Sequence, residues 1–223
     1  MSNIKLVHSG GNSVSLTTPD SNPAANRTFK LPGADGTSGQ AMVTDGSGGL
    51  SFANTLKNFG TTTISSAQSE VDIDFDVTNY SNFKLMLEGW NPSADCNMYC
   101  RFKINGSIST GSNYCSLTIK KYAGGFDSNE YGGSNQNYGY MSHNVGGNDG
   151  TYETYSAQLE IMTGSGTGMP FMNLSTFYKD NNNAYVHNMG IVGYQNWEQI
   201  QGIRIYPSTG NITAGKYTLY GIK

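Results

Sequence analysis

The chain has few charged residues and no basic excess. Only 13% of its 223 residues are Asp, Glu, Lys or Arg, and its formal net charge is −3 at pH 7. A protein that binds nucleic acid electrostatically needs clustered Lys and Arg on its surface. The composition therefore predicts no nucleic-acid partner.

Long hydrophobic runs are also missing. No apolar stretch approaches the roughly 20 residues that a membrane-spanning helix needs. The first residues, MSNIKLVHSGGN, turn polar after Val7, whereas a secretory signal carries a longer apolar segment. We therefore expect neither membrane insertion nor a signal peptide.

Cysteine is scarce, with 3 residues at Cys96, Cys100 and Cys115. On one strand, Cys96 and Cys100 would lie about 13 Å apart on the same face, which is too far for a disulfide. The odd number and this spacing predict three reduced thiols. Such thiols suit assembly in a reducing cytoplasm.

Residue patterns for catalysis, metals and cofactors are missing as well. There is no Gly-x-Ser-x-Gly and no phosphate-binding loop. Asp72, Asp74 and Asp76 resemble the start of a calcium loop but lack its later Gly and Glu, so a solvated strand face fits better. Other candidates without suitable partners are His8, His143, His187, Asp127, Glu130, Asp149 and Glu153. We therefore predict that the chain is not an enzyme and holds no metal and no cofactor.

Glycine, tyrosine and turn-forming pairs are abundant instead. The 29 Gly and 15 Tyr residues, together with few good helix formers, are typical of a β protein. Residues 12–53 contain Asn-Pro, Pro-Gly, Asp-Gly and Gly-Gly between very short apolar runs. Strands this short cannot bury a core alone. We expect this region to wrap around copies of itself or to lie on a partner.

The later part of the chain contains longer strands. Val71, Ile73 and Phe75 alternate with Asp, which predicts a half-buried strand with an acidic outer face. Residues 83–90 alternate in the same way, and seven further runs follow between Gly, Asn and Ser turns. Nine or ten such strands indicate an antiparallel β-sandwich.

The predicted organisation is all-β. A short-stranded N-terminal attachment or shaft region covers residues 1–53, a linker covers residues 54–60, and a jelly-roll-like β-sandwich head covers residues 61–223. The closing stretch, KYTLYGIK, carries apolar or aromatic residues on both faces. We expect it to be a central strand that is buried on both faces.

A tyrosine-rich stretch, residues 122–155, is expected to be a long loop in which Tyr alternates irregularly with Asn, Ser and Gly. This composition is typical of adaptable recognition loops, and the rings suit the apolar faces of sugars. The alternative, slightly favoured by the length of the loop, is that the rings pack within it or against another subunit. The candidate ligand or receptor contacts are Trp90, Phe126, Tyr131, Tyr138, Tyr140 and Tyr152.

Two parts of the chain resemble one class of proteins. The sequence NRTFKLPGADGTSGQAMVTDGSGGLSF, residues 26–52, resembles the N-terminal shaft or attachment segments of bacteriophage fibre and virion surface proteins, especially those of marine phages and cyanophages. Residues 80–119 and the closing LYGIK, residues 219–223, resemble a head domain of the same proteins. The resemblance carries no catalytic residues that could be transferred.

The resemblance implies a structural virion surface protein that is made in the cytoplasm of a host bacterium. It would be a homotrimeric head fibre or capsid-decorating protein, anchored to other virion proteins by its N-terminal region. The alternative is a tail fibre or receptor-binding tip that adheres to a host surface glycan, and a glycan-cleaving enzyme is disfavoured because no carboxylate pair converges. The candidate virion-attachment or oligomer contacts are Ile4, Leu6, Val7, Phe29, Leu31, Leu219 and Ile222.

Overall fold

In the computed structural model the chain divides into two compact units, Met1–Asn54 (unit 1) and Thr55–Lys223 (unit 2). The residues that the structure describes are 4–16, 20–21, 23–37, 40–53, 56–122, 125–147, 153–164 and 168–222, with only the backbone of residues 14, 16 and 125–130. Strands, turns and irregular segments make up these ranges, and no helix occurs within them.

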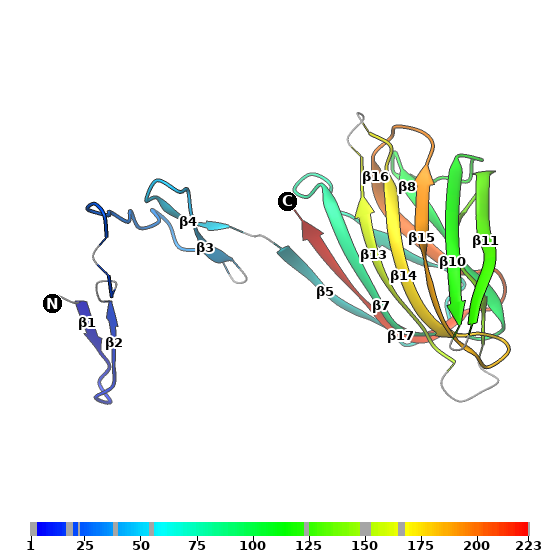
Figure 1. Cartoon of the computed structure of the whole chain (residues 1–223), viewed down its shortest axis with the longest axis horizontal. Coiled ribbons are helices and arrows are strands. Elements are labelled where there is room, and N and C mark those ends of the chain that lie inside the picture. The colour runs from blue at the N-terminus through cyan, green and yellow to red at the C-terminus, as the bar shows by residue number, and fades with distance from the viewer. Residues whose placement is uncertain are drawn as a thin grey trace. The chain divides into compact units, whose positions relative to one another are not determined.

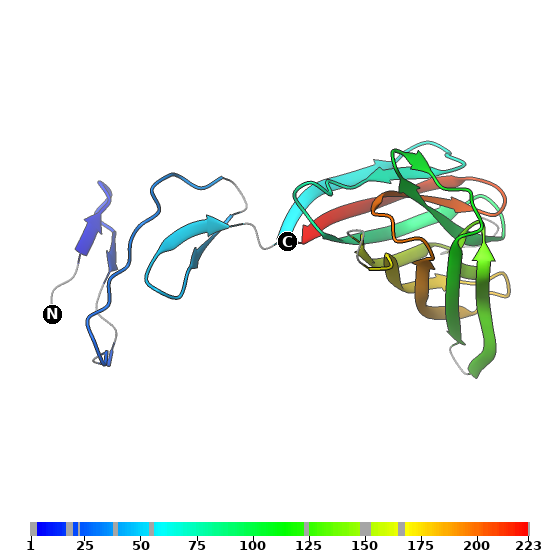
Figure 2. The same cartoon turned by 90° about the horizontal axis from the view of Figure 1, so that it is seen from above.

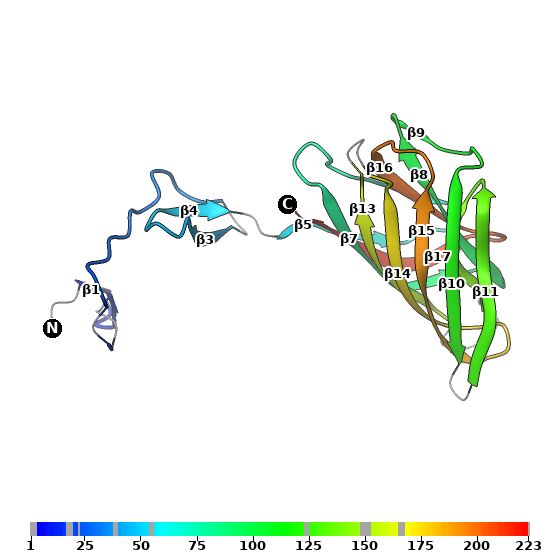
Figure 3. The same cartoon turned by 45° about the horizontal axis from the view of Figure 1, so that its top comes forward.

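Unit 1 contains two short antiparallel hairpins (Figure 3). β1 (Ile4–Val7) pairs with β2 (Ser13–Leu16), and β3 (Ala41–Thr44) pairs with β4 (Leu50–Ala53). An isolated two-stranded hairpin is only marginally stable in water. The buried core of the described residues begins at Ile64, so unit 1 contributes nothing to it.

The β3–β4 turn shows how the turn-rich sequence folds locally. The carboxylate of Asp45 accepts hydrogen bonds from the backbone N–H groups of Ser47 and Gly49, at 2.7 and 2.9 Å. These bonds lower the pKa of Asp45. Gly46 and Gly48 adopt φ angles of 78° and 94°, which glycine reaches without strain. The Asp-Gly pair therefore specifies the turn, as the sequence indicates.

Unit 2 is a sandwich of two antiparallel sheets (Figure 1). In sheet order, the eight-stranded sheet contains β11 (Gly125–Gln136), β10 (Tyr114–Tyr122), β15 (Tyr185–Tyr194), β14 (Phe171–Lys179), β13 (Tyr155–Met162), β7 (Asn82–Pro92), β17 (Ile212–Ile222) and β5 (Leu56–Ile64). The five-stranded sheet contains, in order, β12 (Gly139–Val145), β8 (Cys96–Ile104), β16 (Ile200–Pro207) and β6 (Val71–Asp74), with β9 (Ser107–Ile108) paired to β8. The predicted all-β class and β-sandwich are confirmed.

The larger sheet is twisted, so its β5 and β11 edges run in clearly different directions (Figures 1 and 2). A twist of this kind is the normal outcome for L-residues in extended strands. The core lies between the two sheets, and the alternating residues of β7 fill it as the sequence predicts. Phe83, Leu85 and Leu87 are at most 1% exposed. β8 opposes them with Met98, Cys100 and Phe102, each fully buried.

The tyrosine-rich stretch is not the long loop that its composition suggested. Residues 125–136 form β11 and residues 139–145 form β12, which belong to different sheets. The pairings of both strands contain register shifts. Gly132 and Asn135 also adopt positive φ, at 139° and 57°. These irregularities interrupt the alternation of apolar and polar residues in this stretch. Its sequence therefore resembles that of a loop, although its backbone pairs as strands.

Within residues 54–60, where a linker is expected, β5 begins at Leu56. Eight of the nine β5 residues are exposed or half-buried, and only Ile64 is buried. An edge strand of this kind lacks the alternation that marks a half-buried strand. Its pairing with β17, from Leu56 opposite Ile222 to Ile64 opposite Gly215, defines it as part of the head.

β17 pairs on both sides, with β7 and with β5. Leu219 lies opposite Leu85 and is only 7% exposed. Leu219 is therefore a core residue of the head rather than a virion or oligomer contact, which corrects its expected role. Ile222 is half-buried at the end of the strand.

Candidate functional site

Four tyrosines form a cluster on part of the outer face of the five-stranded sheet. Tyr99 alternates with buried residues on β8, so its side chain points away from the core. The ring of Tyr138 stacks on it with centroids 4.2 Å apart and planes at 27°. Tyr140 and Tyr206 contact Tyr99 edge-on, at 5.4 and 5.8 Å. We call these four residues the tyrosine cluster.

Polar groups fix the cluster at its margins. The Asn97 side-chain amide donates to the Tyr99 hydroxyl at 3.1 Å. The Arg101 guanidinium lies 5.2 Å from the ring centroid of Tyr206, and its Nε donates to the Asn137 carbonyl at 2.9 Å. Burial raises the pKa of Tyr206 to about 12. The four rings therefore pack mainly on one another, which favours the packing alternative.

Tyr131 of β11 adjoins this cluster, with its ring centroid 6.4 Å from that of Tyr140, and packs over a buried cation. Its ring stacks on His143 with centroids 4.3 Å apart. The ammonium of Lys120, which is fully buried, lies 5.2 Å from the Tyr131 centroid and 5.4 Å from the Tyr122 centroid. Two rings at this distance stabilise a desolvated ammonium. This arrangement gives Tyr131 a structural role.

Trp90 is not a surface contact, which corrects its place among the expected ligand residues. It is fully buried, and its indole N–H donates to the Lys216 carbonyl at 3.0 Å. Of Phe126 the structure describes only the backbone, in β11, and Tyr152 lies outside the described residues.

The other expected attachment contacts lie in unit 1 with their side chains in solvent. Their exposed fractions run from 64% at Ile4 to 78% at Leu31. The full set of these exposed apolar residues is Ile4, Leu6, Val7, Phe29 and Leu31. They remain available for contact with another chain.

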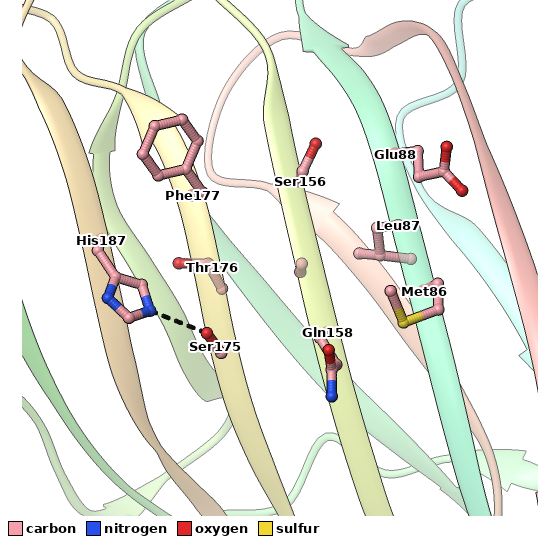
Figure 4. A pocket seen from close by; sticks show the side chains of 10 residues that line it. Met86, Leu87, Glu88, Ser156, Gln158, Ser175, Thr176, Phe177 and His187 are labelled. Carbon is pink, nitrogen blue, oxygen red and sulfur yellow. Dashed lines mark hydrogen bonds between the residues drawn. The ribbon is translucent and has the colours of Figure 1, made fainter.

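A groove that the sequence did not indicate crosses the outer face of the eight-stranded sheet (Figure 4). It has a volume of about 530 Å³ and runs over β7, β13, β14 and β15. Its outward-facing side chains are those of Met86, Glu88, Ser156, Gln158, Ser175, Phe177 and His187. We call this feature the groove.

Hydrogen bonds and ring contacts order the side chains of the groove. The Ser175 hydroxyl and Nε2 of His187 lie 2.9 Å apart, and Figure 4 shows the two side chains turned toward each other. At the β7 margin, Glu88 Oε2 forms an ion pair with Lys216 Nζ at 2.8 Å. At the opposite margin, the Phe177 ring lies nearly parallel to the Tyr185 ring, with centroids 6.0 Å apart and planes at 9°.

The same sheet also exposes aliphatic side chains. Leu117 and Ile119 of β10 lie directly opposite Ile191 and Met189 of β15. Their exposed fractions lie between 38% and 48%. We call these four residues the aliphatic patch. Contiguous exposed apolar surface of this kind is typical of protein interaction sites.

One residue pattern in the sequence could have indicated this face of the sheet. Along β14 the buried positions are Met172, Leu174, Thr176 and Tyr178. The alternation therefore places Phe177 on the outer face, where a large apolar ring is unusual. A strand with an aromatic residue at an outward position could have been identified as a contact candidate.

Ion pairs occupy the acidic outer face predicted for β6. Arg204 of β16 donates to both oxygens of Asp72, from Nε and Nη2, at 2.7 Å each. Its Nη1 also pairs with Glu70 at 2.8 Å, and Lys103 pairs with Asp74 at 2.7 Å. These contacts join three strands of the smaller sheet.

We expect Asp72→Asn to destabilise the head only above acidic pH. The Arg204 hydrogen bonds hold the pKa of Asp72 below its usual value. A depressed carboxyl pKa contributes stability above the unfolded pKa of about 3.9, and that stability is lost as pH falls through the folded pKa. Because the pair is half-exposed, the loss at pH 7 should be under about 1 kcal/mol.

Thermal melting at a series of pH values measures this effect. The difference in melting temperature between parent and Asp72→Asn should shrink toward zero as pH falls through the folded pKa of Asp72. Glu160→Gln, which removes an exposed carboxylate from the other sheet, serves as the matched control. An Asp72→Asn difference that stays constant down to acidic pH would contradict the assignment.

The described residues contain no group of three or more His, Cys, Asp or Glu side chains placed to hold a metal ion. Within the same ranges, no helix is long and apolar enough to cross a membrane. All three cysteines are free, and burial raises the pKa of Cys96 to about 12. No known protein family matches the chain, and no curated protein matches it.

Proposed function

We propose that the chain is a structural protein of a bacteriophage virion surface, made in the host bacterium and assembled as a homotrimer. In this proposal unit 1 attaches to other virion proteins or intertwines with its copies, and the β-sandwich is displayed. The observation that carries the proposal is the exposure of the apolar side chains of unit 1 in a single chain. The resemblance of residues 26–52 to phage attachment segments supports the virion assignment.

The aliphatic patch gives independent support for association. Unit 1 exposes its side chains because its hairpins are too short to cover them, whereas the patch lies on a well-formed sheet. Burying apolar surface of this kind contributes about 25 cal/mol per Å². Contact between chains would cover both features.

We expect light scattering on the full-length protein to give three times the 24.0 kDa chain mass. Replacing Phe29 and Leu31 together by Ser should lower the mass, because these two exposed side chains lose their apolar contacts between chains. Trp197→Ser, which removes an exposed ring from the head, is the matched control and should leave the mass unchanged. A parent protein that is monomeric at micromolar concentration would overturn the trimer.

Location on the particle tests the virion assignment itself. Gold-labelled antibodies raised against the head should bind intact particles. Label over the capsid supports a head fibre or decorating protein, and label at the tail supports the alternative. Particles that carry no label, although the antibody binds the purified protein, would contradict the proposal.

Adhesion to a host surface glycan is the second candidate function. The observation that favours it is the combination of exposed aromatic rings and neutral polar side chains on the outer face of the larger sheet. Rings stack on the apolar faces of sugars, and amides and hydroxyls pair with sugar hydroxyls. A tail fibre or receptor-binding tip needs such a surface.

A further inference from the structure

We propose that the groove on the outer face of the eight-stranded sheet binds a neutral saccharide, with Phe177 and Tyr185 as its stacking platform. This inference rests on the second candidate function and names its ligand class and its residues. It moves the expected binding surface from the tyrosine-rich stretch to the outer face of β7, β13, β14 and β15.

The platform is the first element of the argument. Phe177 and Tyr185 are 56% and 51% exposed, although large rings are normally buried. They come from adjacent strands, β14 and β15, and their planes differ by only 9°. The two rings stack on each other, and each offers to solvent the apolar surface of the face that is turned away from its partner. Such a surface matches the axial C–H face of a pyranose ring.

The polar side chains of the groove are the second element. Ser156 and Gln158 of β13 and Ser175 of β14 line it beside the platform. His187 holds the Ser175 hydroxyl at 2.9 Å, which fixes that hydroxyl in position. Amide, hydroxyl and imidazole groups both donate and accept hydrogen bonds, as sugar hydroxyls do. Because the groups are carried by strands, their spacing is set before a ligand arrives.

Charge and size define the ligand class. The residues that line the groove include no Lys or Arg. Glu88, its only carboxylate, is already paired with Lys216 at the margin. Lys179 lies opposite Tyr185 and Lys121 opposite His187 in the strand pairing. Neither lysine lines the groove, so the lining itself favours a neutral ligand. The volume of about 530 Å³ falls within the range of about 300–1,000 Å³ typical of small-ligand sites.

The tyrosine cluster lacks this combination. Tyr138 stacks on Tyr99 at 4.2 Å, and Tyr140 and Tyr206 direct their contacts to the same ring. The four rings of the tyrosine cluster are half-buried, whereas Phe177 and Tyr185 are both more than half exposed. In the groove, by contrast, the polar side chains and the exposed rings lie side by side on one sheet face.

The test titrates the full-length protein with a fixed panel of trisaccharides. Four are neutral, built from glucose, mannose, galactose or N-acetylglucosamine, and one is acidic, built from galacturonic acid. Saturation-transfer NMR detects binding, and calorimetry measures affinity. At least one neutral trisaccharide should bind. Phe177→Ala and Gln158→Ala should each weaken that binding at least tenfold, with unchanged melting temperatures because both side chains lie on the surface.

Tyr138→Ala is the matched control, since it removes an aromatic ring that packs on Tyr99 of the opposite sheet, and it should leave the affinity unchanged. If Tyr138→Ala abolishes binding while Phe177→Ala does not, adhesion stands and the groove is wrong. If only the acidic trisaccharide binds, adhesion again stands and the neutral ligand class is overturned. If no member of the panel binds, both this inference and the adhesion candidate fail, whereas the structural virion role is decided by particle labelling.

Discussion

Replacing Trp90 by Ala is expected to lower the free energy of unfolding of the head by about 3–5 kcal/mol. The side chain is fully buried in the core, so its removal leaves a cavity that the sheets cannot close. It also leaves the Lys216 carbonyl without its indole donor. For a domain of this size, the corresponding fall in melting temperature is about 6–20 °C.

Trp197→Ala provides a control with the same chemical change. Trp197 is 60% exposed, so its replacement should change stability by no more than about 0.5 kcal/mol. Calorimetric melting of the two variants and the parent measures the contrast. If Trp90→Ala melted with the parent and lost ligand binding instead, the residue would be a binding contact and its burial in the core would be refuted.

Trp90 also illustrates where sequence reasoning about sites is weakest. Its strand was predicted correctly from alternation, because Phe83, Leu85 and Leu87 repeat every second residue. Gly89, at a φ of 60°, and a register shift beside Trp90 interrupt that alternation. The residue type suggested a surface contact, whereas this backbone irregularity places the Trp90 ring in the core. Periodicity therefore predicts the regular part of a strand better than its irregular end.

The parts of the fold that the sequence did not indicate depend on strand pairing between segments that are far apart in the chain. β5 has little apolar signal of its own and exists as a strand because β17, at the other end of the chain, pairs with it. Pairing in two different sheets likewise turns residues 125–145 into β11 and β12. Local propensity is a weak guide where tertiary pairing decides the outcome.

The groove could not be predicted because its residues come from four separate strands. Glu88, Gln158, Phe177 and His187 are each ordinary outward residues of an antiparallel strand. Only the sheet order β15–β14–β13–β7 brings them onto one surface. The alternation of residues along a strand predicts which face of the sheet each side chain occupies. It does not give which strands are neighbours.

Deleting residues 216–223 is expected to abolish cooperative folding of the head. β17 supplies hydrogen bonds to β7 on one side and β5 on the other, so its loss leaves β5 without a partner. The deletion also removes Leu219, which is 7% exposed and packs in the core. The Thr61–Thr218 hydroxyl contact at 2.7 Å is lost with it. Circular dichroism during heating should show no sharp transition.

Two further variants test whether the effect comes from the loss of β17 itself or simply from shortening the chain. Removing residues 1–54, a much longer segment, should leave the cooperative melting of the head intact, because no core residue lies there. Leu219→Ala should cost about 2–5 kcal/mol, the value for a large aliphatic side chain in a core. A protein that lacks residues 216–223 yet melts cooperatively at the parent temperature would show that β17 is peripheral. The pairing of β17 on both sides leads us to expect the opposite, since a strand between two others cannot leave without opening the sheet.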